Sequence, residues 1–249
     1  MTRIAVTAAA FVALPAIAGT RIEYVDENSG EARTVLAIKD GKARMDSADD
    51  AGYVLFDANA RTLTTVNPNE KTFTVMDEAS MQQLSAEVSS AMAEMRAQLE
   101  RMPPEQRAMV EKMMGGAMNA GKSMLETTVE RTGRTLEKAG HACEQVIFSV
   151  GSVARTELCV ADAGEVGVPD EDRATMNAMY RQMQAMAETM MKNFGMESAP
   201  DMSALDGIAV YMKQDNEKSG EILGNVTHDG IDASLFAIPD DYREESLRQ

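Results

Sequence analysis

The sequence predicts an α+β domain in which a curved antiparallel β-sheet, shaped like a half-barrel, is covered by methionine-rich helices. Three observations support this fold class: short strand-like segments separated by turn residues, two long blocks with helical spacing of apolar residues, and 21 methionines in 249 residues. With 44% hydrophobic residues, the chain can build an ordinary core. We expect a single α+β domain over residues 19–239, followed by a polar tail at residues 240–249.

The first half of the expected sheet lies between residues 21 and 77. Strand-like segments alternate there with turns rich in glycine, asparagine, aspartate or proline. The segments are 21–26, 34–39, 42–46, 53–57, 62–67 and 72–77. Because short turns join consecutive segments, they predict an antiparallel meander. Strand-like sequence returns at residues 127–160 and 207–239.

Two helical blocks are expected, at about residues 78–125 and 170–194. Pro103 and Pro104 interrupt the first block, because proline lacks the N–H group that a helix interior needs. In the second block, methionines recur at spacings of three and four residues, which places them on one helical face. Across the two blocks, the methionines that we identify as a candidate apolar ligand face are Met92, Met95, Met176, Met179, Met183, Met186 and Met190.

A methionine stripe is compatible with an apolar face or with a Cu(I) site. The first block mixes Leu84 and Val88 into its stripe, and neither side chain can coordinate copper. We therefore favour an apolar face, on which unbranched methionine side chains fill irregular space. Copper binding is the alternative, through Met113, Met114 and Met118 or through Met190 and Met191.

The N-terminus has the pattern of an export signal. Arg3 precedes an apolar stretch from Ile4 to Leu14, and small residues end the segment at Ala18. The predicted cleavage lies between Ala18 and Gly19, which offers no thiol for lipid attachment. No later apolar run approaches the roughly 20 residues of a membrane-spanning helix. We therefore expect a soluble, unlipidated periplasmic protein.

The only two cysteines, Cys143 and Cys159, are expected to form a disulfide. They lie at equal distances from Gly151, which predicts directly opposed positions in a β-hairpin. The oxidising periplasm would close this bond. A redox or metal pair is disfavoured, because the sequence has no C-x-x-C motif and the two histidines, His141 and His228, lie far apart in the sequence.

No catalytic, cofactor-binding or metal-binding constellation stands out, so we do not expect an enzyme. The net charge of −16 disfavours nucleic acid as a partner, because a phosphate backbone needs a basic surface. Residues 116–123 match the phosphate-binding loop pattern G-x-x-x-x-G-K-S. That motif needs a strand before it and a helix after it, whereas a helical pattern precedes this segment, so nucleotide binding is not expected.

Several strand ends and turns together resemble a known group of proteins. They are residues 53–57, 65–73, 157–161 and 235–239. With the export signal, the cysteine pair and the methionine-rich insert, they resemble an exported bacterial family of unknown function that is similar to lipoprotein-localisation carriers of the LolA and LolB type. Those carriers wrap a curved antiparallel sheet around helices and hold acyl chains between them. The resemblance implies the same architecture here.

Three functions therefore follow as hypotheses, and the third is the copper binding through methionines described above. The first is a non-catalytic periplasmic protein that binds a hydrophobic small molecule or lipid. The second is an envelope protein-interaction module with a filled core and an acidic surface for a protein partner. A cavity between sheet and helices would distinguish the first from the second.

Overall fold

The computed structural model describes residues 19–48, 51–103, 106, 127–150, 154–193, 205–228 and 230–246. Its strands form one sheet in the order β12-β6-β5-β4-β3-β2-β1-β11-β10-β9-β8-β7. Neighbouring strands are antiparallel except β12 and β6, which are parallel. The predicted combination of an antiparallel sheet with helices is confirmed. The expected export signal, residues 1–18, lies outside the described residues.

The predicted N-terminal meander is confirmed. Its strands are β1 (Thr20–Asp26), β2 (Ala32–Lys39), β3 (Lys42–Ser47), β4 (Tyr53–Asp57), β5 (Thr62–Asn67) and β6 (Thr72–Met76). The turn between β2 and β3 consists of Asp40 and Gly41, both with positive φ, at 51° and 74°. Two-residue hairpin turns of this kind match the twist of the flanking strands, so the local sequence directly specifies this connection.

The second half of the sheet comes from the C-terminal part of the chain. Its strands are β7 (Thr127–Lys138), β8 (His141–Val150), β9 (Ala154–Ala161), β10 (Ile208–Gln214) and β11 (Glu221–Thr227). Strand β11 pairs with β1 and so joins the two halves. The strand-like pattern of residues 228–239 does not form a strand among the residues described there. Asp232 instead caps the short 3₁₀ helix η2 (Ala233–Phe236) by accepting a hydrogen bond from the Ser234 N–H.

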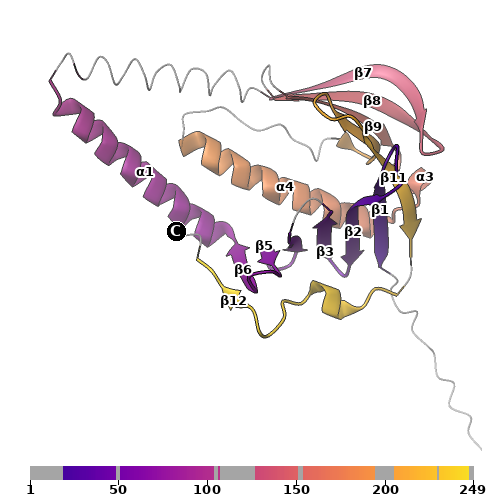
Figure 1. Ribbon diagram of the computed structural model, residues 1–249, viewed down its shortest axis with the longest axis horizontal. Helices are drawn as coiled ribbons and strands as arrows, with labels where there is room; N and C mark the ends of the chain where they lie inside the picture. The colour runs from indigo at the N-terminus through magenta and orange to yellow at the C-terminus, as the bar shows by residue number, and fades with distance from the viewer. Residues whose placement is uncertain are drawn as a thin grey trace, which may run out of the picture.

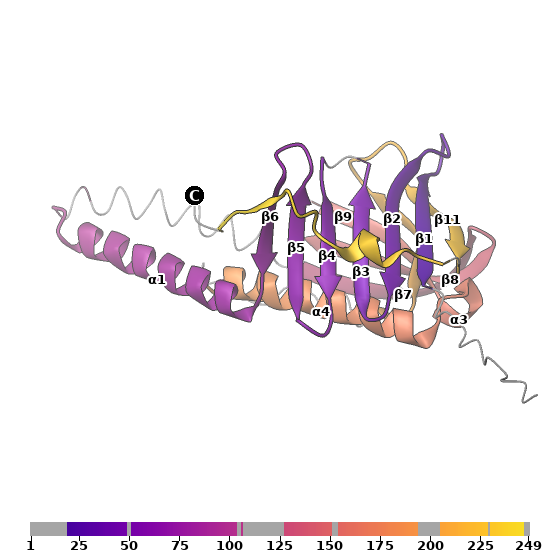
Figure 2. The ribbon, with the colours of Figure 1, turned by 90° about the horizontal axis from the view of Figure 1, so that it is seen from below.

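The C-terminal segment crosses the first meander on the face away from α4 (Figure 2). Leu55 and Phe56 are both buried, because successive strand residues point to opposite faces and each face is covered. Phe56 belongs to the main core, whereas Leu55 joins a separate cluster that Ile238 and Tyr242 contact. The polar tail then adds β12 (Arg243–Glu244) along β6.

The described helices are α1 (Glu78–Glu100), α3 (Ala163–Val166) and α4 (Asp170–Asn193). Asp77 and Ser80 form a capping box that starts α1, and the helix ends shortly before Pro103. Helix α4 lies along one face of the sheet, whereas α1 extends past the β6 edge (Figure 1). Residues 104–105 and 107–126 of the first predicted block lie outside the described residues.

The predicted half-barrel curvature is not found. The sheet is not strongly curled, and it is open, because each edge strand, β12 and β7, pairs on one side only. The helical cover is also uneven: α4 buries Met176 and Met179, whereas Met81 is the one methionine of the described α1 side chains that is buried. Within the described residues, no helix is long and apolar enough to cross a membrane.

The predicted disulfide between Cys143 and Cys159 is confirmed, with Cα atoms 5.3 Å apart. The predicted register is wrong. Val150 pairs with Ala154, so the centre of the hairpin lies one residue beyond Gly151 and Gln145 is directly opposite Cys159. The disulfide therefore joins diagonal neighbours, whose Cα separation of 5.3 Å lies within the range that a disulfide spans.

Candidate functional site

An apolar cavity of about 280 Å³ lies between α4 and the sheet. Residues of β1, β2 and β3 line one side, residues of β9, β10 and β11 line another, and α4 closes it. The apolar side chains that line it include Leu36, Met45, Leu158, Met176, Met179 and Met212. The core between α4 and the sheet is therefore incompletely filled.

Cross-strand pairing brings the cavity-lining strand residues onto one face. Leu36 on β2 lies opposite Met45 on β3. Met212 on β10 lies opposite Leu158 on β9 and opposite Glu221 on β11. Directly opposed residues of antiparallel strands point to the same side of a sheet. The two rows thus form walls of a single space beneath α4.

Helix α4 contributes Met176, Met179 and Tyr180, which share one helical face because they are three and four residues apart. The side chains of Met176 and Met179 are 4% and 1% exposed. These two residues of the candidate apolar face line the cavity and also belong to the main core.

The structure does not bring the whole candidate face together. Met183 is 42% exposed, and Met186 lines a different hollow, of about 340 Å³, where α1 meets α4. Met95 is half-buried on α1. The side chains of Met92 and Met190 lie outside the described part of the structure, as do the side chains of the copper alternative, Met113, Met114, Met118 and Met191.

One end of the cavity is polar and consists of Tyr24, Thr34, Tyr180 and Glu221. The Thr34 hydroxyl donates a hydrogen bond of 3.2 Å to Oε2 of Glu221. Burial raises the pKa of Tyr24, and the electrostatic influence of Tyr180 and Glu221 raises it further. Burial also raises the pKa of Tyr180. Both phenols are therefore protonated hydrogen-bond donors at neutral pH.

Sequence analysis did not identify these tyrosines. Strand alternation places Tyr24 on the same side of β1 as Ile22, and helical spacing places Tyr180 beside Met176. Those two signals are visible in the sequence. Nothing in the sequence, however, indicates which side of β1 faces α4, so the pairing of the two phenols depends on the tertiary fold.

The cavity reaches solvent near Asp206, which lines it and has a side chain that is 82% exposed. Arg173 lies at this opening and forms ion pairs with Asp206 at 3.1 Å and with Asp170 at 3.0 Å. The guanidinium group links the first turn of α4 to the segment before β10.

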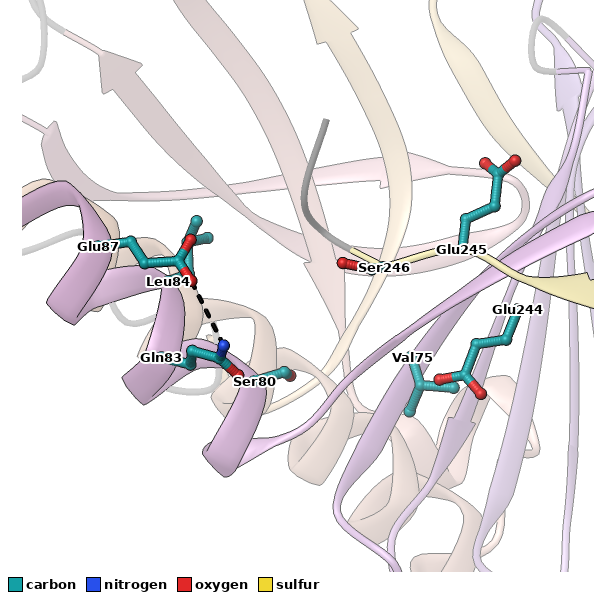
Figure 3. Close-up of a pocket in the computed structure, with 8 residues that line it drawn as sticks. All are labelled: Val75, Ser80, Gln83, Leu84, Glu87, Glu244, Glu245 and Ser246. Atoms are coloured by element: carbon teal, nitrogen blue, oxygen red, sulfur yellow. Dashed lines mark hydrogen bonds between the residues drawn. The ribbon is translucent and has the colours of Figure 1, made fainter.

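A third hollow, of about 170 Å³, lies between the first turns of α1 and the C-terminal segment (Figure 3). Its walls carry Glu87, Glu244 and Glu245, and Gln83 donates a hydrogen bond of 3.3 Å to Glu87. Among the described residues that line it, only Val75 and Leu84 are apolar. In Figure 3, Glu244 is directed toward Val75 and Glu245 away from it. This hollow has the wrong chemistry for an apolar ligand.

Within the described residues, no group of three or more His, Cys, Asp or Glu side chains is arranged to hold a metal ion. The segment that matches the phosphate-binding loop, residues 116–123, lies outside them. The apolar cavity beneath α4 is therefore the candidate site that the described geometry favours.

A family model, described as "Domain of unknown function (DUF4412)", matches residues 93–242. The chain belongs to the DUF4412 family. In this DUF4412 protein, the matched range contains β7 to β11 and α4, and hence Tyr180, Leu158 and Met212. The meander that supplies Tyr24 and Leu36 precedes it.

No curated protein matches the sequence of this DUF4412 chain. Among solved structures, two crystal forms of PNGF-II, in space groups C2 and P21, are similar, with TM-scores of 0.43 and 0.41. Each shares 10% sequence identity and aligns with 92% of this chain. The chain spans only 31% of the length of PNGF-II.

Proposed function

We propose that this DUF4412 protein is a non-catalytic periplasmic binding protein for a hydrophobic or lipid-like ligand. The observation that carries the proposal is the apolar cavity between α4 and the sheet, of about 280 Å³. An interaction module with a filled core would have no such space. The cavity therefore favours ligand binding over the envelope-interaction hypothesis.

The volume of the cavity limits the size of the ligand. Engineered apolar cavities of ~150 Å³ bind benzene, and small-molecule pockets commonly span roughly 300–1,000 Å³. A cavity of about 280 Å³ accommodates one apolar chain or a small ring system. It has no room for several acyl chains at once.

Two further features support an exported carrier. The N-terminal 18 residues have the pattern of a signal peptide, and the disulfide between Cys143 and Cys159 is consistent with an oxidising compartment. The strand-end and turn motifs also resemble those of proteins similar to lipoprotein-localisation carriers, which hold acyl chains between a sheet and helices.

Ligand extraction and dye binding test this function. Organic extracts of the purified mature protein should contain a co-purifying lipid, identified by mass spectrometry. The delipidated protein should bind an apolar fluorescent dye that amphiphiles displace. Absence of both co-purifying lipid and dye binding would contradict the proposal.

A variant that obstructs the cavity tests whether the dye binds there. Ala209 on β10 lines the cavity, so Ala209→Leu should occupy part of it and weaken dye binding at least about tenfold. The matched control is Ala142→Leu, which makes the same change at an exposed position of β8. Equal dye binding by the two variants would place the ligand elsewhere.

A further inference from the structure

We propose that the ligand is a neutral amphiphile with a single apolar chain, whose head group offers oxygen acceptors to the hydroxyls of Tyr24 and Tyr180. This inference rests on the proposed function and adds the chemical class of the head group. It is carried by three properties of the cavity: two donors without protein partners, a lining that contains carboxylates and no cation, and a volume for one chain.

The first property concerns the two phenols. Within the described residues, neither the Tyr24 nor the Tyr180 hydroxyl makes a hydrogen bond to another protein group. No fully buried side-chain nitrogen or oxygen among those residues lacks a partner. The two hydroxyls must therefore retain some accessible surface, and the space beside both residues is the cavity that they line. Two donors thus face a largely apolar space, and a ligand that covered them without offering an acceptor would leave both hydroxyls unpaired at a free-energy cost.

Burial of the two tyrosines keeps their phenols protonated. Desolvation raises the pKa of both tyrosines, so each carries its hydroxyl hydrogen across the physiological pH range. A bound head group must supply oxygen acceptors to use these donors.

The second property concerns charged head groups. Glu221 and Asp206 line the cavity, and none of its described lining residues is a lysine, arginine or histidine. A carboxylate ligand would therefore enter an apolar space whose described lining holds no cation to compensate for its desolvation. Arg173 at the opening already binds Asp170 and Asp206. The lining carboxylates of Glu221 and Asp206 already bond to Thr34 and Arg173. An ammonium head has donors but no acceptor, so it would leave the two phenolic hydrogens unpaired.

The test compares three amphiphiles that have the same twelve-carbon chain and different heads. The probes are 1-monododecanoylglycerol, dodecanoate and dodecylamine, each titrated into the delipidated mature protein at neutral pH with displacement of an apolar dye. We expect the neutral ester to bind at least about tenfold more tightly than either charged probe. If dodecanoate or dodecylamine binds as tightly, this inference is wrong and the proposed function stands. If none of the probes and no dye binds, the proposed function itself fails.

Two conservative variants then locate the head group. Tyr24→Phe and Tyr180→Phe each remove one hydroxyl and keep the ring. Each should weaken binding of 1-monododecanoylglycerol about threefold to tenfold, the usual effect of losing one neutral hydrogen bond, and leave binding of dodecane unchanged. The control is Tyr53→Phe, because Tyr53 belongs to the cluster on the opposite face of the sheet. Unchanged ester binding in both cavity variants would overturn the assignment of these tyrosines.

Discussion

The hydroxyl of Thr20 donates a hydrogen bond of 2.5 Å to Oδ2 of Asp172, and this contact joins the first residue of β1 to the first turn of α4. Thr20 is fully buried and Asp172 is 5% exposed. Nδ1 of His228, at the end of β11, lies 3.2 Å from the same hydroxyl oxygen. The buried Thr20–Asp172 contact therefore anchors the helix that closes the cavity to β1, and His228 adds a contact from the residue that follows β11.

Replacing Thr20 with valine should destabilise the protein. The side chain keeps its shape but no longer donates to the buried Asp172 carboxyl group, and an unsatisfied buried acceptor costs about 1–3 kcal/mol. Denaturant unfolding measures the loss. The matched control is Thr65→Val, at an exposed position of β5, where a change within about 0.5 kcal/mol is expected. Similar losses in the two variants would mean that the Thr20–Asp172 hydrogen bond contributes nothing.

The Asp172→Asn variant should show a pH-dependent gain in stability. Burial raises the pKa of Asp172 above its ordinary value of 3.8, against the opposing effect of the hydrogen bond from Thr20. A carboxyl group with a raised pKa favours folding below its ordinary pKa, and that stabilisation is lost as the pH rises through the folded-state value. Asparagine keeps an acceptor for Thr20 and does not ionise.

The free energies of unfolding of wild type and Asp172→Asn should therefore diverge as the pH rises from about 3.8 toward 7, with the variant gaining relative to the wild type. Urea titrations at a series of pH values measure this difference. A constant difference across the range would show that Asp172 titrates as it does in the unfolded chain.

Two methionines on the same helix should respond very differently to truncation. Met179→Ala removes a side chain that is 1% exposed and packed in the main core, which typically costs about 2–5 kcal/mol. Met183→Ala changes a residue that is 42% exposed, so we expect a change within about 0.5 kcal/mol. Both lie on α4, so the helix propensity gained from alanine is the same. Equal effects in thermal or denaturant unfolding would contradict the burial of Met179.

The two cysteines should act as one unit. Cys143→Ser, Cys159→Ser and the double variant should each lower the stability by a similar amount, on the order of 3 kcal/mol for a ring of this size. Reduction of the wild-type protein should produce the same loss. Unequal losses in the single variants, or a further loss in the double variant, would show that the residues contribute separately.

Much of the secondary structure is predictable from local signals. Glycine, asparagine and aspartate at the turns, as at Asp40 and Gly41, separate the strands of the first meander, so the bounds of those strands were predicted closely. The disulfide was predicted from spacing alone. Its register was not, because the prediction centred the hairpin on Gly151, one residue too early.

The candidate site was only partly predictable. Helical periodicity identifies Met176 and Met179 on one stripe of α4, but the same periodicity includes Met183, which the structure leaves exposed. A repeating pattern cannot indicate where along a helix the sheet stops covering it. The polar end of the cavity was missed, because Tyr24 and Glu221 are almost two hundred residues apart and come together only through the pairing of β1 with β11.

Short-range sequence signals thus suffice for the α+β class, the strand and helix positions, the cysteine pair and the acidic, methionine-rich character of the chain. Side-chain alternation and helical spacing act over a few residues, so they report local structure reliably. The open shape of the sheet, the covering of both its faces and the cavity beneath α4 arise from contacts between distant segments. Whether such segments fill the space between them depends on the packing of all their side chains together, and only the folded structure specifies it.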